Sequence, residues 1–273
     1  MTYKTKLCIQ LPVPDEELGP FANLLDVVKN LGYIGVETCV KDPWTFDRAE
    51  FIDMIHSRGM VVPAVATGRG KRLDGLCLLD RYAEIAEKAV QRLKDQTDLL
   101  VELGGKKLIL GSMKGMAAEG ESQEEAGARL APFLQRVADY AASKDCEIVL
   151  EAMNRFETNM ANTAAEACVI AKMADRSNVR VLLDTFHMNI EDTSIAGSII
   201  ETGDMLGHMH VVDSNRCGCG AGHIDFAAVL AAIYEIGYDE FVTLEQFSDP
   251  DVPRAASMTV KHLTELGMEI VPA

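Results

Sequence analysis

Four short apolar runs decide the fold of this chain: EIVLEAM (147–153), VRVLLDTF (179–186), GHMHVVD (207–213) and EFVTLEQF (240–247). They are rich in the β-branched and aliphatic residues that strands favour. The longer stretches between them carry apolar residues at three- and four-residue spacing, which is typical of a helix with one buried face. This alternation predicts parallel strands joined by crossover helices.

The same alternation extends through the N-terminal half. Four further strands are predicted there: KLCIQL (6–11), YIGVETCV (33–40), MVVPAVAT (60–67) and KKLILGSM (106–113). Glycines in KNLGYIGVE, VELGGKKLIL and YEIGYDEFV stand where a left-handed cap would end a helix before the next strand. Asn162 and Asp225 are expected to cap the starts of the helices that follow them. The chain is therefore expected to contain eight strand–helix units.

Eight such units in 273 residues favour an α/β fold of the closed (β/α)8 TIM-barrel type over an open doubly wound sheet. A doubly wound sheet would show a glycine-rich phosphate-binding first turn, whereas the first predicted strand here runs into QLPVPDEEL. The segment GRGKRL (68–73) is not such a motif, and we expect it to be a loop at the barrel mouth. Because no Pro- or Ser-rich linker divides the chain, residues 1–273 are expected to form a single barrel domain.

Polar residues stand late in four of the predicted strands. Glu151, Asp184, His210 and Glu245 are separated by 33, 26 and 35 residues, each about one strand–helix repeat. In a barrel the carboxyl ends of the strands build the active site. Because side chains alternate along a strand, each of the four is expected to share its inward face with the residue two positions before it. We expect the four side chains to meet at the barrel mouth.

Three carboxylates crowded together in an apolar setting would repel one another and take up protons unless a cation compensates them. The sequence therefore predicts one divalent metal ion bound by Glu151, Asp184, His210 and Glu245. Three oxygens and one imidazole favour Mn²⁺ first, with Mg²⁺ or Co²⁺ as alternatives, over an ion that prefers thiolates. Catalytic Zn²⁺ is kept as a further alternative.

Charge and composition limit the range of partners. The chain has 48% apolar and 25% charged residues, as in a typical globular protein, and a formal net charge of −16. That charge repels polyanions, so nucleic acid is not an expected partner. The start of the sequence has no apolar run of signal-peptide length, and no segment reaches the ~20 apolar residues of a membrane span. We expect a cytoplasmic protein that does not bind membranes.

The seven cysteines are odd in number and mostly lie within apolar runs, which suits reduced, buried thiols. One cluster, CGCGAGH, brings Cys217, Cys219 and His223 close together and raises the alternative of a structural zinc site. Such a site usually has four nitrogen or sulfur ligands, and no second pair lies nearby.

The segments EAMNRFETNMANT, LLDTFHMNIEDTS, GHMHVVDSNRCGCGAGHIDF and IGYDEFVTLEQF resemble the sugar phosphate isomerase/epimerase-like, or xylose isomerase-like, TIM-barrel superfamily. Within it they look like the ketose 3-epimerase branch of D-tagatose and D-psicose 3-epimerases, over most of residues 147–247. In the N-terminal half, AVATGRGKRLDGLCL and KKLILGSMKG look more like the 5-keto-gluconate epimerase type.

The resemblance implies a role for each matching residue. Glu151, Asp184, His210 and Glu245 are similar to the family's metal ligands, and Glu151 and Glu245 to its proton-transferring pair. Glu157, His187 and Arg216 fall where the family contacts its sugar substrate. The implied activity is inversion of C3 in a ketose or keto-aldonate through a cis-enediolate, by a homodimer or homotetramer.

Several alternatives stay open at this point. An aldose–ketose or hydroxypyruvate-type isomerase and an inosose-type dehydratase use related proton abstraction on the same barrel. A metal- or sugar-binding protein without turnover is the non-enzyme alternative. An apurinic-site endonuclease is disfavoured, because it would need more metal ligands than six histidines suggest and a basic groove. Arg69, Lys71 and Arg72 would suit a substrate carboxylate or phosphate if their segment turned inward.

Overall fold

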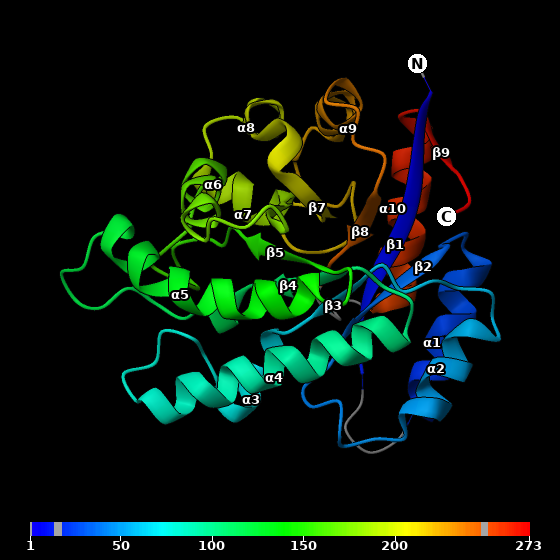
Figure 1. Ribbon diagram of the computed structural model, residues 1–273. Helices are drawn as coiled ribbons and strands as arrows, with labels where there is room; N and C mark the ends of the chain where they lie inside the picture. The colour runs from blue at the N-terminus through cyan, green and yellow to red at the C-terminus, as the bar shows by residue number, and fades with distance from the viewer. Residues whose placement is uncertain (1, 14–17, 247–250) are drawn as a thin grey trace.

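The computed structural model describes residues 2–13, 18–246 and 251–273, and its parallel strands form a closed barrel (Figure 1). Strands β1 to β8 follow one another round the barrel in chain order, and pairing of β2 with β1 closes the ring. The predicted (β/α)8 TIM barrel is thus confirmed. The barrel strands are β1 (Tyr3–Pro12), β2 (Gly35–Cys39), β3 (Ala64–Ala66), β4 (Lys107–Leu110), β5 (Glu147–Glu151), β6 (Val179–Asp184), β7 (Leu206–Val211) and β8 (Phe241–Leu244).

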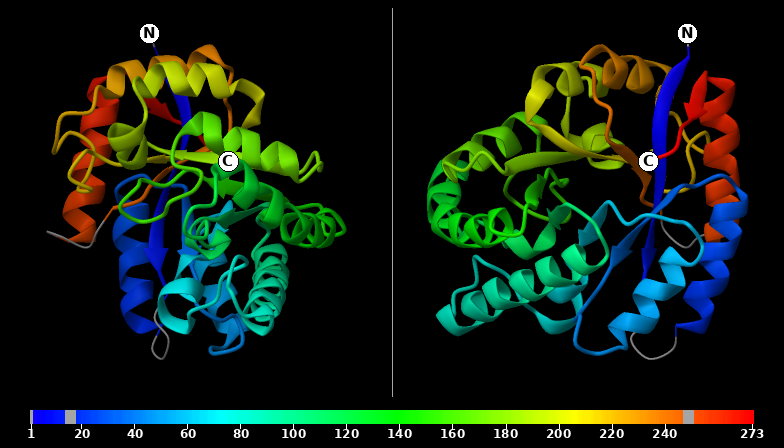
Figure 2. Two further views of the ribbon diagram at one scale, coloured as in Figure 1. Left: turned by 90° about the vertical axis from the view of Figure 1, so that its left-hand side faces the viewer. Right: turned by 45° about the vertical axis from the view of Figure 1, so that its right-hand side comes forward.

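Helices surround the barrel on its outside (Figure 2). Two strands are followed by a short helix before the longer covering helix: α3 follows β3, and α7 follows β6. Among the described residues, no helix is long and apolar enough to cross a membrane. The helices are α1 (Gly19–Asn30), α2 (Arg48–His56), α3 (Gly68–Asp74), α4 (Ala83–Glu102), α5 (Gln123–Ala142), α6 (Ala164–Met173), α7 (Thr185–Glu191), α8 (Ile195–Thr202), α9 (Phe226–Glu235) and α10 (Val252–Glu265), with 3₁₀ turns η1 (Ser112–Lys114) and η2 (Gly203–Met205).

Two local expectations were wrong, and one strand was not predicted. The segment GRGKRL is not a loop: it forms most of α3. The cap of α6 is Thr163 rather than Asn162, because Thr163 and Glu166 form a reciprocal capping box. A ninth strand, β9 (Met268–Ile270), was not predicted and pairs with the start of β1 outside the barrel (Figure 1). The cap at Asp225 is confirmed, since its side chain accepts from Ala228 N.

Several predicted strands extend beyond the first or last residue of the observed strand. The third, expected over 60–67, is only Ala64–Ala66, and the fifth and sixth stop at Glu151 and Asp184. Phe247, the last residue expected in the eighth strand, lies outside the described residues.

The core has two parts. The larger part fills the space between strands and helices, and a small cluster of Ala64, Ala66, Ile109, Val149 and Leu182 fills one side of the barrel interior. Val149 and Leu182 precede Glu151 and Asp184 by two positions, so period-two alternation aims the carboxylates along the same inward face. The interior between β2 and β7 is polar instead and contains Glu37 and His208, both fully buried.

Candidate active site

Glu151, Asp184, His210 and Glu245 meet at the carboxyl ends of four successive strands, as the spacing predicts. One potential ligand atom from each lies within 4.8 Å of the others. Glu151 and Asp184 are the last residues of β5 and β6, His210 lies in β7, and Glu245 directly follows β8. Parallel register sets Asp184 beside His210. Closing the barrel therefore gathers three carboxylates and one imidazole.

Crowding and burial change the protonation of two of these carboxyl groups. Burial, together with the charge of Glu245, raises the pKa of Glu151 to about 7. Burial likewise raises the pKa of Asp184 well above its ordinary value, although Arg216 opposes that shift. Both groups therefore bind a proton more readily than an ordinary carboxylate does.

Arg216 supplies a positive charge within this cluster. Its Nη2 lies 2.6 Å from Glu245 Oε2 and 3.4 Å from Asp184 Oδ2. Burial alone would raise the pKa of Glu245, but Arg216 and His210 hold it well below its ordinary value. Arg216 has a left-handed backbone with φ of 58°, a conformation that a non-glycine residue adopts at some cost. The strained turn places its guanidinium over the strand ends.

His187, on α7, points its Nε2 into the site. Its Nδ1 accepts hydrogen bonds from the backbone N–H and the side-chain amide of Asn154, at 3.2 and 2.7 Å. Burial, reinforced by Arg216, lowers the pKa of His187 to about 3, so the ring is neutral. With Nδ1 accepting, the single proton sits on Nε2, 3.7 Å from Glu151 Oε1. This Nε2 is buried and has no hydrogen-bond partner among the described residues.

Glu157 lies in the segment after β5 and joins the site through Arg216. Its Oε1 accepts from Arg216 Nη1 at 3.2 Å and from Asn154 Nδ2 at 3.1 Å. The side chain is about two-fifths exposed, so it forms part of the pocket rim. Asn154 contacts both Glu157 and His187, a positioning role that no sequence pattern indicated.

A buried group beneath the four residues supports His210. Glu37 Oε2, on β2, accepts from His208 Nε2 at 2.8 Å and from His210 Nε2 at 3.1 Å. Burial opposes ionisation of Glu37, but the two histidines lower its pKa to about 2. Burial would lower the pKa of His210, whereas Glu37 and Glu245 raise it well above its ordinary value. Because Nε2 of His210 faces Glu37, its Nδ1 is the nitrogen that faces the other three residues.

Glu37, His208 and His210 are themselves close enough to hold a metal ion. Their facing atoms, however, already satisfy one another by hydrogen bonds, and Glu37 and His208 do not line the pocket. Glu37 lies in the second predicted strand, and its contact with His210 depends on barrel closure.

Two residues after β4, Gly111 and Lys114, lie against Glu151. A side chain at Gly111 would overlap Glu151 Oε2, so only glycine leaves room for that carboxylate. Lys114 is fully buried and donates through Nζ to the carbonyl of Glu151 at 3.2 Å. Burial lowers the pKa of Lys114 to about 8, while Glu151 and Glu157 oppose that shift. No sequence signal pointed to Lys114, because its partner belongs to the next strand of the barrel.

The alternative zinc site is not supported. Cys217, Cys219 and His223 are absent from the candidate metal groups found among the described residues. Their loop is instead organised by Asp213, whose carboxylate accepts from the backbone N–H groups of Ser214, Gly220 and Ile224. His223 is exposed and contacts Ser214.

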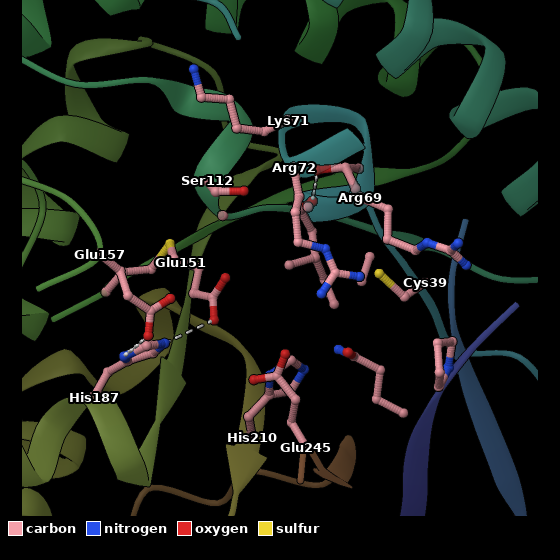
Figure 3. Close-up of a pocket in the computed structure, with 18 of the residues that line it drawn as sticks. Cys39, Arg69, Lys71, Arg72, Ser112, Glu151, Glu157, His187, His210 and Glu245 are labelled. Carbon is pink, nitrogen blue, oxygen red and sulfur yellow. Dashed lines mark hydrogen bonds and ion pairs between the residues drawn. The ribbon is translucent and has the colours of Figure 1, made fainter. Parts of the chain in front are cut away.

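A cavity of about 500 Å³ opens over the site and is large enough for a monosaccharide. Six of the seven residues predicted for the site line it: Glu151, Glu157, His187, His210, Arg216 and Glu245. Asp184 lies beneath them, fully buried. Arg69, Lys71 and Arg72 of α3 form part of another wall (Figure 3).

The cluster fits a divalent cation by its own chemistry. Three carboxylates and one imidazole nitrogen are an oxygen-rich donor set suited to Mn²⁺ or Mg²⁺. Two of the carboxyl groups have pKa values raised by burial, so a cation would offset a charge repulsion that protons otherwise relieve.

Known proteins resemble this chain over most of its length. Residues 25–266 match the family described as xylose isomerase-like TIM barrel. An L-ribulose 3-epimerase of Methylomonas sp. (strain DH-1) is 34% identical over 235 residues, which cover 84% of this chain and 79% of that protein. A ketose 3-epimerase of Arthrobacter globiformis is 30% identical over 233 residues, covering 83% and 78%.

A solved structure agrees with these relatives. The D-allulose 3-epimerase from Methylomonas sp., in complex with D-allulose, superposes with a TM-score of 0.83 at 27% identity and covers 97% of this chain and 99% of that one. Fold, sequence relatives and structural neighbour thus agree. The chain belongs to the xylose isomerase-like TIM barrel family, in its branch of ketose 3-epimerases, which are carbohydrate isomerases.

Proposed function

We propose that this protein is a metal-dependent epimerase that inverts C3 of a ketose or keto-aldonate through a cis-enediolate, with residues 1–273 acting as one domain. The observation that carries the proposal is the cluster of Glu151, Asp184, His210 and Glu245 under a sugar-sized cavity. Relatives named as ketose 3-epimerases, and one solved with D-allulose, support a sugar substrate.

In this proposal those four residues hold one divalent ion, Mn²⁺ in preference to Mg²⁺ or Co²⁺, with Zn²⁺ less suited. The ion, when bound, supplies Lewis acidity towards the substrate's carbonyl and neighbouring hydroxyl oxygens. Glu37 supports this assignment because it occupies Nε2 of His210 and leaves Nδ1 for the ion.

Glu151 and Glu245 are the proposed acid–base pair. Inversion requires that one group removes the proton from one face of C3 and another delivers a proton to the opposite face. The two glutamates come from β5 and the end of β8, and β6 and β7 separate these strands round the barrel. That separation supports their approach to the substrate from different sides.

His187, Arg216 and Glu157 are the proposed substrate contacts. The Nε2 proton of neutral His187 is available to donate to a substrate oxygen, because no described residue accepts it. Arg216 would donate to the oxygen that gains negative charge as the C3 proton leaves. Glu157 accepts a hydrogen bond from Nη1 of that guanidinium and so helps to orient it.

We also propose that the protein works in the cytoplasm as a homodimer or homotetramer. All seven cysteines are free, which suits a reducing compartment. Exposed aromatic side chains such as Phe156, with an exposed fraction of 81%, offer apolar surface for self-association.

Incubation of the Mn²⁺-loaded protein with a ketose in deuterated water is expected to give the C3 epimer with deuterium at C3. The physical reason is that the glutamate which delivers a hydrogen to the opposite face of C3 carries one taken from the solvent, not the one removed from the substrate. Mass spectrometry and NMR would locate the label, and a chelator should prevent both exchange and inversion.

Other outcomes would identify the alternatives. Hydrogen moved between C1 and C2 would show an aldose–ketose or hydroxypyruvate-type isomerase. An absorbing unsaturated product would show a dehydratase. Tight Mn²⁺ binding without turnover on ketohexoses, ketopentoses, keto-aldonates or their phosphates would favour a binding protein. Inversion without solvent label, unaffected by chelator, would contradict the proposed mechanism.

Replacing Glu37 by glutamine is expected to weaken Mn²⁺ binding roughly ten- to a hundredfold, the usual effect of losing a partner that orients a metal-binding histidine. A neutral amide cannot accept from both His208 and His210 with the strength of a carboxylate, so the His210 ring loses its fixed orientation. Calorimetric titration of Mn²⁺ would measure the change.

Glu235→Gln on the exposed face of α9 is the matched control, because it removes the same charge away from the site. Thermal unfolding of the metal-free variants separates weaker metal binding from a general loss of stability. Unchanged Mn²⁺ affinity in a folded Glu37→Gln protein would show that Glu37 only stabilises the barrel.

A further inference from the structure

The wall of the cavity formed by α3 carries three basic residues, and they point in different directions (Figure 3). Lys71 extends away from the glutamates, and its Nζ lies 3.1 Å from Cys77 Sγ. Arg69 also points away and donates to the Val13 carbonyl. The guanidinium of Arg72 instead reaches into the cavity, between the side of Glu151 and that of Cys39. One cation of the three therefore faces the space that a substrate would occupy.

Arg72 differs from most arginines of this protein in its surroundings. Arg58, Arg92 and Arg136, for example, each form an ion pair with an aspartate or glutamate. Within residues 2–13, 18–246 and 251–273, the Arg72 side chain forms no hydrogen bond or ion pair. Asp74, two residues further along α3, pairs with Arg92 instead. In a chain with 42 acidic and 26 basic residues, Arg72 thus faces the cavity without an acidic partner among the described residues.

The chemistry of this position indicates an anionic ligand. Two carboxylates of the site, Asp184 and Glu245, already pair with Arg216. A planar guanidinium offers parallel N–H donors that match the two oxygens of a carboxylate or a phosphate. Hydroxyl or amide groups would suffice to bind an uncharged end of a sugar. Such an end would leave the positive charge of Arg72 uncompensated.

We propose that Arg72 forms a subsite for an oxyanion, a carboxylate or a phosphate, on the α3 wall of the cavity. This inference rests on the proposed function and narrows its substrate to acidic keto sugars, whereas L-ribulose and D-allulose, which name the relatives above, are uncharged. The cavity of about 500 Å³ has room for a six-carbon keto acid. Arg72 is thus a specificity residue rather than a catalytic one.

The test compares selectivity in three proteins: the wild type, Arg72→Ala and the control Arg81→Ala. Arg81 is exposed, stacks on Tyr82 and does not line the cavity, so its loss removes one positive charge without touching the subsite. For each protein, kcat/KM is measured with Mn²⁺ for a ketohexose, a ketohexonate and a ketohexose 6-phosphate.

The wild type is expected to prefer at least one acidic substrate over the ketohexose. That preference should fall roughly ten- to a hundredfold in Arg72→Ala, which is the usual effect of losing a charge-assisted hydrogen bond. It should persist in Arg81→Ala and recover partly in Arg72→Lys. If Arg72→Ala loses the preference for the ketohexonate, Arg72 binds a carboxylate. If it loses the preference for the ketohexose 6-phosphate, Arg72 binds a phosphate. An unchanged preference in Arg72→Ala, or no preference in the wild type, would overturn the inference.

A binding measurement tests the oxyanion subsite at Arg72 without requiring that the protein turn over a substrate. Calorimetry with gluconate and with sorbitol, neither of which can epimerise, compares a carboxylate with a neutral end group in each variant. Tighter binding of gluconate that depends on Arg72 supports the subsite even if no ketose is turned over, in which case only the proposed function fails. Equal binding of the two compounds by the wild type would overturn the subsite while leaving neutral-ketose epimerisation intact.

Discussion

Glu245→Gln and Glu151→Gln are each expected to lower the rate of inversion by about a hundred- to ten-thousandfold, the usual contribution of a positioned acid or base. Glutamine has nearly the same shape as glutamate but can neither take a proton from carbon nor return one. Under the proposal each epimer faces one of the two groups, so loss of either glutamate blocks inversion in both directions. The rate of epimer formation with saturating Mn²⁺ is the measurement.

Isotope exchange at C3 tests the role of each glutamate separately. A protein that retains only one of the two glutamates should still exchange the C3 hydrogen of the epimer that faces it, while forming almost none of the other epimer. Glu151→Gln and Glu245→Gln should therefore label opposite epimers in deuterated water. Loss of exchange from both epimers in both variants would instead indicate that metal binding had failed.

Glu147→Gln is a suitable control, since Glu147 lies at the opposite end of β5 and pairs with Lys107. Its activity should stay close to that of the wild type. Inversion within about tenfold of the wild-type rate in either active-site variant would contradict the assignment of Glu151 and Glu245 as the proton-transferring pair.

Removal of metal is the second change with a large expected effect. Chelation should abolish inversion, and Mn²⁺ should restore it, because the proposed chemistry needs the Lewis acid that the three carboxylates and the imidazole would hold. Mn²⁺ at a hundred times its dissociation constant should stabilise the protein by about 2.7 kcal/mol, which raises the unfolding temperature by several degrees. Asp184→Asn should lose most of this thermal shift, since it removes one anionic ligand without changing size.

The affinity for Mn²⁺ should also depend on pH in a defined direction. Burial and Glu245 raise the pKa of Glu151 to about 7, so below that pH a proton occupies a carboxylate that the metal needs. Binding should accordingly weaken as the pH falls from 8 to 6 and should release protons, which calorimetry in buffers of different ionisation enthalpy would detect. Affinity that is independent of pH, with an unchanged thermal shift in Asp184→Asn, would place the metal elsewhere.

The sequence by itself determined the barrel and the main composition of the site. Alternating apolar runs and glycine-capped turns are local patterns, and strand periodicity fixes which side chains face inward. Repeat spacing alone could therefore predict that Glu151, Asp184, His210 and Glu245 lie close together. The family resemblance added Glu157, His187 and Arg216, which the structure places within contact distance of the same cluster or its rim.

Only the tertiary structure decided the contacts between distant parts of the chain. Glu37 supports His210 from 173 residues away, and Lys114 contacts a carbonyl on the neighbouring strand. The proton position on His187 depends on Asn154, which approaches from a different segment. The expected loop at 68–73 is largely helical, and the direction of Arg72 follows from that helix. The contacts of Glu37, Lys114 and Asn154 arise from barrel closure, which brings together side chains whose separation along the sequence has no period, so no local pattern could predict them.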